Sequence, residues 1–91
     1  MVRPRVCRRL RFRPKSNYFK PQGIPMLELE EILLTKEEME SIKLKDFDKM
    51  EQIEAAQKMN TSQSTFQRIL ASARGKISEA IVRGRALKIE K

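Results

Sequence analysis

The clearest hydrophobic pattern lies in the C-terminal part of the chain. Between Ser62 and Arg83, apolar residues recur at spacings of three and four, which places them in one stripe along a helix. The stripe consists of Phe66, Ile69, Leu70, Ala73, Ile77, Ala80 and Ile81. Ser62 is a favourable N-cap and Gly84 can end the run in the left-handed conformation. The pattern predicts a long helix over residues 62–83.

Two shorter helices are predicted before it. Thr35 and Glu38 have the T-x-x-E spacing of a capping box, which predicts a helix over 35–46. Its inner face would hold Met39 and Ile42, with Phe47 near its end. The next helix is predicted over 50–59, ends at Asn60, and has an apolar set of Ile53, Ala55, Ala56 and Met59.

The beginning of the chain is rich in proline. All four prolines lie within residues 1–25, and proline disfavours a helix there. We expect an extended arm over 1–25, in which Tyr18, Phe19 and Ile24 form an ordered strap. The apolar stretch 26–34 is ambiguous, and Pro25 would suit the first turn of a short helix.

The tail after residue 85 alternates Leu87 and Ile89 with charged residues. Such alternation is compatible with a short strand, for which the arm around Leu10 and Phe12 is one available partner. The three helices dominate the pattern. We therefore predict an all-α, tri-helical domain over 26–91 with a long C-terminal helix.

The second and third helices have the features of a helix-turn-helix. Ala56 supplies the small residue that a close helix crossing needs. Asn60 tolerates a positive φ in the turn. Phe66 is placed to fill the space between the two helices with its ring. Because such pairs also occur as plain structural hairpins, the exposed face and the charge must decide the function.

The outward face of the third helix is short or polar near its start. With Phe66 at the centre of the buried stripe, Ser64, Arg68, Ala71 and Gly75 point outward. Such a face fits the major groove of DNA, where Gln can contact adenine and Arg can contact guanine or phosphate. Gly75 either permits close backbone approach or is tolerated there. The candidate DNA-contacting residues on this helix are Ser62, Gln63, Ser64, Thr65, Gln67, Arg68 and Arg74.

The net charge of +8 is unevenly distributed. Residues 1–20 carry eight bases and no acid, residues 21–59 carry five bases and ten acids, and residues 60–91 carry seven bases and two acids. Basic ends around an acidic middle favour a folded scaffold that contacts a polyanion. The arm residues expected to contact phosphates or the minor groove are Arg3, Arg5, Arg8, Arg9 and Arg11.

The missing residue types argue against catalysis and cofactors. The chain has no His and one Cys, which removes His-based triads and the usual zinc sites, and it has no glycine-rich phosphate loop. We expect no enzyme activity, no metal and no cofactor. Cys7 is either a small apolar residue of the arm or a redox-sensing thiol activated by its arginine neighbours. No apolar run is long enough to span a membrane, and the basic start lacks the apolar stretch of a signal peptide. Because a single Cys cannot form an internal disulfide, we expect a cytoplasmic protein with a reduced thiol.

Several segments carry resemblances. The segments Leu34-Thr35-Lys36-Glu37-Glu38, Ile53-Glu54-Ala55-Ala56 and Ser62-x-x-Thr65-Phe66 resemble region four of bacterial sigma factors. Nearly the whole chain is similar to a small uncharacterised prokaryotic family of predicted DNA-binding proteins. The blocks that carry this likeness are Arg3-Pro4-Arg5, Cys7-Arg8-Arg9, Tyr18-Phe19-Lys20-Pro21-x-Gly23-Ile24-Pro25, Glu30-Glu31-Ile32 and Thr65-Phe66-Gln67-Arg68-Ile69-Leu70-x-x-Ala73-Arg74. The resemblance implies a region-four-like domain of the winged-helix-like superfamily that binds DNA, although Asn60 and Gly75 depart from its usual residues.

The leading hypothesis is a sequence-specific transcription regulator that binds double-stranded DNA and associates with the nucleoid. One alternative is a basic RNA- or ribosome-associated protein. Another is an interaction module whose acidic residues contact RNA polymerase; these are Glu28, Glu30, Glu31, Glu37, Glu38 and Glu40. Homodimers on paired half-sites are also compatible with so short a chain, with Val82, Leu87 and Ile89 as the contact.

Overall fold

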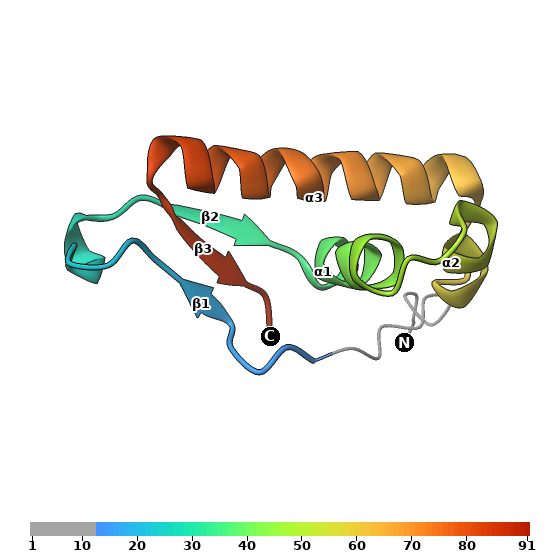
Figure 1. Ribbon diagram of the computed structural model, residues 1–91, viewed down its shortest axis with the longest axis horizontal. Helices are drawn as coiled ribbons and strands as arrows, with labels where there is room; N and C mark the ends of the chain where they lie inside the picture. The colour runs from blue at the N-terminus through green and yellow to red at the C-terminus, as the bar shows by residue number, and fades with distance from the viewer. Residues whose placement is uncertain (1–12) are drawn as a thin grey trace, which may run out of the picture.

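The computed structural model describes residues 13–91. The elements follow in the order β1 (Tyr18–Phe19), the 3-10 helix η2 (Met26–Glu28), β2 (Glu31–Leu34), α1 (Lys36–Ile42), the π-helix η3 (Lys43–Phe47), α2 (Gln52–Lys58), α3 (Gln63–Arg83) and β3 (Ala86–Ile89). In Figure 1, α3 runs along the whole molecule, with the sheet beneath its C-terminal half and α1 beneath its middle. The opposite side of α3 is left uncovered.

The start of α1 and both ends of α3 lie where their capping residues predict. Thr35 and Glu38 form both halves of the capping box at the start of α1. Ser62 caps α3 by accepting a hydrogen bond from the backbone N–H of Thr65, and Gly84 ends it in the left-handed conformation. Short-range chemistry therefore fixes these boundaries.

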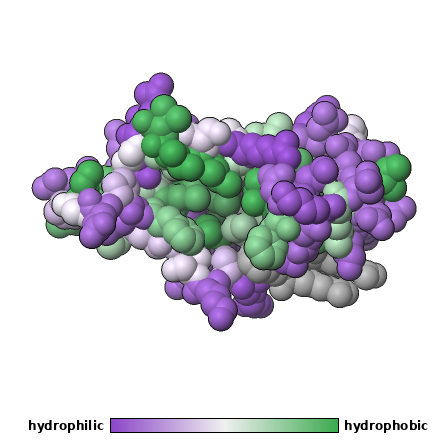
Figure 2. Space-filling view, in the orientation of Figure 1, coloured by the Kyte–Doolittle hydropathy of each residue, from purple (hydrophilic) through white to green (hydrophobic). Residues whose placement is uncertain are grey.

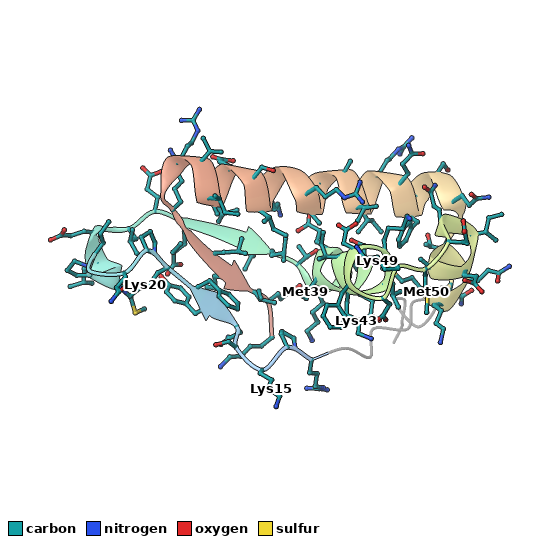
Figure 3. All side chains as sticks on the ribbon, in the orientation of Figure 1. Lys15, Lys20, Met39, Lys43, Lys49 and Met50 are labelled. Atoms are coloured by element: carbon teal, nitrogen blue, oxygen red, sulfur yellow. The ribbon has the colours of Figure 1, made fainter. Side chains whose placement is uncertain are left out.

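The helix predicted over 35–46 changes type before it ends. After Ile42 the backbone widens into the π-helix, in which the N–H of Asp48 donates to the carbonyl of Lys43 at 2.8 Å. The ammonium group of Lys43 also bonds the carboxylate of Asp48 at 2.7 Å. Lys49 then has a φ of 62°, which turns the chain towards α2. In Figure 3, Lys49 and Met50 lie at this connection.

The prediction of an all-α fold is wrong, because three strands form a mixed sheet in the order β1-β3-β2. The tail is the central strand: it pairs in parallel with β2, with Glu31 opposite Ala86, and antiparallel with β1, with Tyr18 opposite Lys88. The hydroxyl of Tyr18 reaches across β3 to the carboxylate of Glu31 at 2.8 Å. Each strand is too short to show a decisive period, and the partners are brought together only by the fold. The tail is a strand as the alternation suggested, but its described partners are not the arm around Leu10 and Phe12.

Two buried clusters lie against α3, one for each half of the molecule. The first joins α2 and η3 to the start of α3 and consists of Leu44, Ala55, Ala56, Met59, Phe66 and Leu70. The second joins the sheet to the middle of α3 through Leu34, Ala73 and Ile89. No helix in residues 13–91 is both long and apolar enough to cross a membrane.

Several apolar residues do not lie where their pattern placed them. Phe47, Ile53 and Ile81 were expected to face the core, yet each is exposed. The buried part of the apolar stripe on α3 is therefore narrower at the C-terminal end than the spacing predicted, because only the small sheet covers the helix there. Conversely, Ile89 is buried against α3, so it cannot form the dimer contact that the sequence suggested for it.

Candidate nucleic-acid interface

The segment from α2 through the turn to α3 has the positive φ at Asn60 and the buried crossing residues that its sequence predicted. Asn60 has a φ of 54°, and its N–H donates to the carbonyl of Gln57 at 2.9 Å. The N–H of Thr61 donates to the carbonyl of Ala56 at 3.0 Å, which closes the turn. Ala56 and Phe66 are both buried at the crossing. The angle between α2 and α3 is therefore set by a buried junction and a hydrogen-bonded turn.

The start of α3 is organised by hydroxyl groups. The Oγ atom of Ser62 accepts the Thr65 N–H at 3.1 Å and donates to Oγ1 of Thr65 at 3.0 Å. It also lies 3.3 Å from Oγ of Ser64. Ser62 and Thr65 thus shape the first turn, while Gln63, Gln67 and Arg68 extend from it.

The outward row predicted for α3 is exposed in the structure. Its members are Ser64, Arg68, Ala71 and Gly75, and the neighbouring candidates Gln63 and Gln67 are exposed as well. The row lies on a helix that other elements cover from one side only (Figure 1). Within residues 13–91, Arg68 makes no side-chain hydrogen bond or ion pair, so its guanidinium is available to an external acceptor.

Arg74 has an internal partner, which the sequence did not reveal. Its Nη2 and Nε atoms lie 2.5 and 3.1 Å from the two carboxylate oxygens of Asp46 in η3. The hydrogen bonds from Arg74 hold the pKa of Asp46 below its ordinary value, and they raise the pKa of Arg74. Half of the Arg74 side chain is still exposed. The pair therefore competes with any phosphate for this guanidinium.

Glu38 is the main residue that the sequence analysis misplaced. Besides its predicted place in the capping box, it was counted among the acidic residues that would contact RNA polymerase, but it is buried between α1 and α3. Its carboxylate accepts hydrogen bonds from Lys76 at 2.8 Å and Ser72 at 2.5 Å, as well as from the Thr35 N–H. Lys76 also bonds the carbonyl of Leu33 at 2.7 Å. The network ties α3 to α1 and β2, and so fixes the orientation of the candidate DNA-contacting helix.

The pKa of Glu38 reflects two opposing effects. Burial alone would raise it, but hydrogen bonds from Lys76, Ser72 and Thr35, together with the positive charge of Lys76, hold the pKa below its ordinary value. The carboxylate is therefore ionised at neutral pH. A signal for this role was present in the sequence, because Ser72 and Lys76 lie four residues apart on one face of the same helix.

Basic residues also meet where the arm enters the fold. Arg13, Lys15, Lys36 and Lys91 surround a hollow of about 340 Å³ beside Glu90, whose carboxylate accepts the Lys36 N–H at 2.9 Å. The arm residues proposed from sequence, Arg3, Arg5, Arg8, Arg9 and Arg11, lie outside the described residues, as does Cys7. Among residues 13–91, no group of three or more acidic, His or Cys side chains could hold a metal ion.

Comparison with known proteins matches residues 1–91 to a family described as "Protein of unknown function DUF134". A UPF0251 protein of Desulforudis audaxviator is 50% identical over 90 residues, which are 99% of this chain and 59% of the relative. One of Pelotomaculum thermopropionicum is 52% identical over 89 residues, which are 98% of this chain and 67% of the relative. One of Dehalococcoides mccartyi is 52% identical over 90 residues, which are 99% of this chain and 77% of the relative.

The chain is shorter than these relatives. It spans about three fifths of the first two relatives found, 59% and 60% of their lengths. Neither the family description nor the relatives' names state an activity. No solved structure matches the chain.

Proposed function

The chain belongs to the prokaryotic DUF134 family, and for this member we propose sequence-specific binding of double-stranded DNA in transcription regulation. The observation that supports the proposal most is the buried α2–turn–α3 junction, which holds a polar and uncovered helix start outward. In this arrangement the start of α3 enters the major groove. Gln63, Ser64, Gln67 and Arg68 contact base edges or neighbouring phosphates. Such a protein would act on the nucleoid, in the cytoplasm.

The charge of the chain supports a polyanionic partner. The net charge is +8, and its largest acid-free basic block is residues 1–20. Two of the acids in the middle of the chain are paired with bases of α3: Glu38, which is buried, with Lys76, and Asp46, which is partly exposed, with Arg74. Phosphate contacts would position the protein, and the few base contacts would provide specificity.

The first experiment is selection of binding sites from a randomised duplex pool at two salt concentrations. An enriched motif is the expected result, because direct base contacts survive added salt better than phosphate contacts. Affinity with a steep salt dependence and no motif would contradict sequence-specific binding. A preference for structured RNA over duplex DNA would favour the RNA-associated alternative.

Arg68→Ala is expected to raise the Kd for the selected site about tenfold to 100-fold and to change the Kd for random duplex much less. Arg68 is exposed on the outward row and has no side-chain partner within residues 13–91. Fluorescence anisotropy with both duplexes measures the two affinities. Arg83→Ala is the matched control, since it removes the same charge from the last turn of the same helix. Equal losses of affinity for both duplexes would mean that Arg68 contacts only phosphate.

Asp46→Asn is expected to strengthen binding to any duplex about twofold to fivefold, because it releases Arg74 to a phosphate. The slope of the logarithm of the binding constant against the logarithm of the salt concentration should become steeper by about one, because one more counterion is released. Binding isotherms at a series of salt concentrations measure both quantities. Glu51→Gln removes the same charge from an exposed side chain five residues away and leaves the Arg74 pair intact. If both variants strengthen binding equally, only net charge matters and Arg74 has no particular role.

A further inference from the structure

The surface of α3 changes character along its length. An apolar hollow of about 450 Å³ opens between β1 and the C-terminal half of α3. Its apolar lining consists of Phe19, Pro21, Ile77, Ala80, Ile81 and Leu87. In Figure 2 a continuous hydrophobic area descends from the C-terminal part of α3 to the strands, while the part over α2 is mostly hydrophilic. This end of the molecule, comprising the sheet, η2 and the C-terminal half of α3, is called the sheet end below.

The two charged residues that line the hollow already have partners. The ammonium group of Lys20, labelled in Figure 3, donates to the carbonyls of Ile24 at 2.8 Å and Pro21 at 3.3 Å. Arg85 pairs with Glu30 at 2.8 Å and with Glu79 at 3.3 Å. The charge of Arg85 is neutralised by carboxylates and the ammonium group of Lys20 is held by two backbone carbonyls, so the rest of the lining, which is apolar, sets the character of the hollow. Its occupant should be apolar and should bring no charge.

Two exposed apolar side chains also project from this surface. Ile81, which lines the hollow, is 76% exposed, and the next residue of α3, Val82, is 82% exposed. Exposed large hydrophobic residues are concentrated at the sheet end, namely Phe19, Ile24, Met26, Leu27, Leu33, Ile81 and Val82. Among residues 13–91, only Phe47 and Ile53 of this group lie elsewhere. An apolar surface of this kind is more often a site of interaction than a surface that stays exposed to water.

We infer that a second copy of this chain covers the sheet end, in a two-fold dimer. A two-fold interface uses one patch twice, so the patch must carry both a projection and a hollow. Here Ile81 and Val82 of each partner enter the hollow of the other. A stable dimer buries about 800 Å² on each partner, roughly one eighth of the 6513 Å² surface, and seven of the nine exposed large hydrophobic residues in the described part of the chain lie at the sheet end.

The interface is independent of the proposed DNA contact. The hollow lies at the end of α3 away from Ser62, so the proposed DNA contacts at the start of α3, from Gln63 to Arg68, lie outside the dimer interface. Two copies joined in this way would present two DNA-contacting helices, as paired half-sites require. The test contains no DNA, so its failure is distinguishable from failure of the proposed function.

Sedimentation equilibrium of the full chain, from micromolar to several hundred micromolar, tests the inference. The wild-type chain is expected to show a monomer–dimer equilibrium. Ile81→Glu and Phe19→Glu should each weaken it at least about tenfold, because each places a carboxylate in an apolar contact. Phe47→Glu and Ile53→Glu are matched controls with nearly the same exposure, 76% against 76% and 54% against 53%, outside the sheet end. Both controls should dimerise like the wild type.

Three outcomes would overturn the inference. These are a wild-type chain that stays monomeric throughout the range, a dimer that survives both sheet-end variants, and equal weakening by the two controls. Circular dichroism and urea unfolding of every variant separate loss of dimerisation from loss of fold. Because Ile81 and Phe19 are on different elements, their agreement also excludes a local distortion of either one.

Discussion

Phe66→Ala is expected to lower the free energy of unfolding by about 3–5 kcal/mol. The phenyl ring is completely buried where α2, η3 and α3 meet, against Leu44, Met59 and Leu70. Its removal costs the transfer free energy of the ring and leaves a cavity that two short helices cannot fill. A domain of this size has a total stability of roughly 5–15 kcal/mol, so this change removes a large part of it. Urea unfolding followed by circular dichroism measures the difference.

Phe47→Ala provides the control for this prediction. Phe47 is 76% exposed, so removing the same ring there should change stability by only about 0.5 kcal/mol. A small effect of Phe66→Ala, similar to that of the control, would contradict the buried junction. The proposed orientation of α3 towards DNA would then lose its support as well.

Glu38→Ala is expected to lower the free energy of unfolding by about 2–4 kcal/mol. The substitution removes half of the capping box of α1 and leaves Lys76 without its carboxylate partner in a partly buried place. The cost stays below that of breaking a fully buried ion pair, because a third of the Lys76 side chain is exposed. Its ammonium group also keeps its hydrogen bond to the carbonyl of Leu33. Urea unfolding at neutral pH measures the loss.

Two further substitutions separate the contributions to this effect. Glu38→Gln keeps a capping side chain but removes the charge, so it should cost about 1–2 kcal/mol. Glu54→Ala removes a carboxylate from the same position of the neighbouring helix α2, where the side chain is exposed, and should cost a few tenths of a kcal/mol. If Glu54→Ala costs as much as Glu38→Ala, the network between α1 and α3 contributes nothing specific.

The pH dependence of stability follows from the lowered pKa of Glu38. The folded state binds a proton at this carboxylate more weakly than the unfolded state, whose ordinary value is 4.5. The stabilisation is therefore complete above that pH and is lost as the pH falls through the lower value of the folded state. Asp46 contributes in the same direction through Arg74. Glu38→Gln should reduce the slope of stability against pH in the acid range, and an unchanged slope would contradict the assignment.

The helices of this protein follow from local sequence signals. The capping box at Thr35, the cap at Ser62 and the left-handed Gly84 act within one turn of the chain, and the structure has all three. The burial of Phe66 and the positive φ of Asn60 are similarly local consequences of spacing and residue type. The candidate face of α3 could therefore be located from the sequence, including the exposure of Gln67 and Arg68.

The partners of charged side chains could not be located in this way. Glu38 and Lys76 are 38 residues apart, and Asp46 and Arg74 are 28 residues apart. Helical periodicity places each residue on a face of its own helix, but it does not say which face of another helix lies opposite. Hence the pattern placed Glu38 on an acidic face that contacts a partner and gave no internal partner for Arg74, whereas the structure pairs Glu38 with Lys76 and Arg74 with Asp46.

The sequence by itself determined the three helices, their caps, the turn at Asn60 and the polar start of α3. The tertiary structure alone decided that the fold contains a sheet, that the tail is its central strand, and that Ile89 is buried while Ile81 is exposed. Helix signals are short-range, because hydrogen bonds and caps join residues three or four positions apart. A strand of two to four residues has no such internal bonds. It forms only where folding brings a distant partner beside it, here Glu31–Leu34 against Ala86–Ile89.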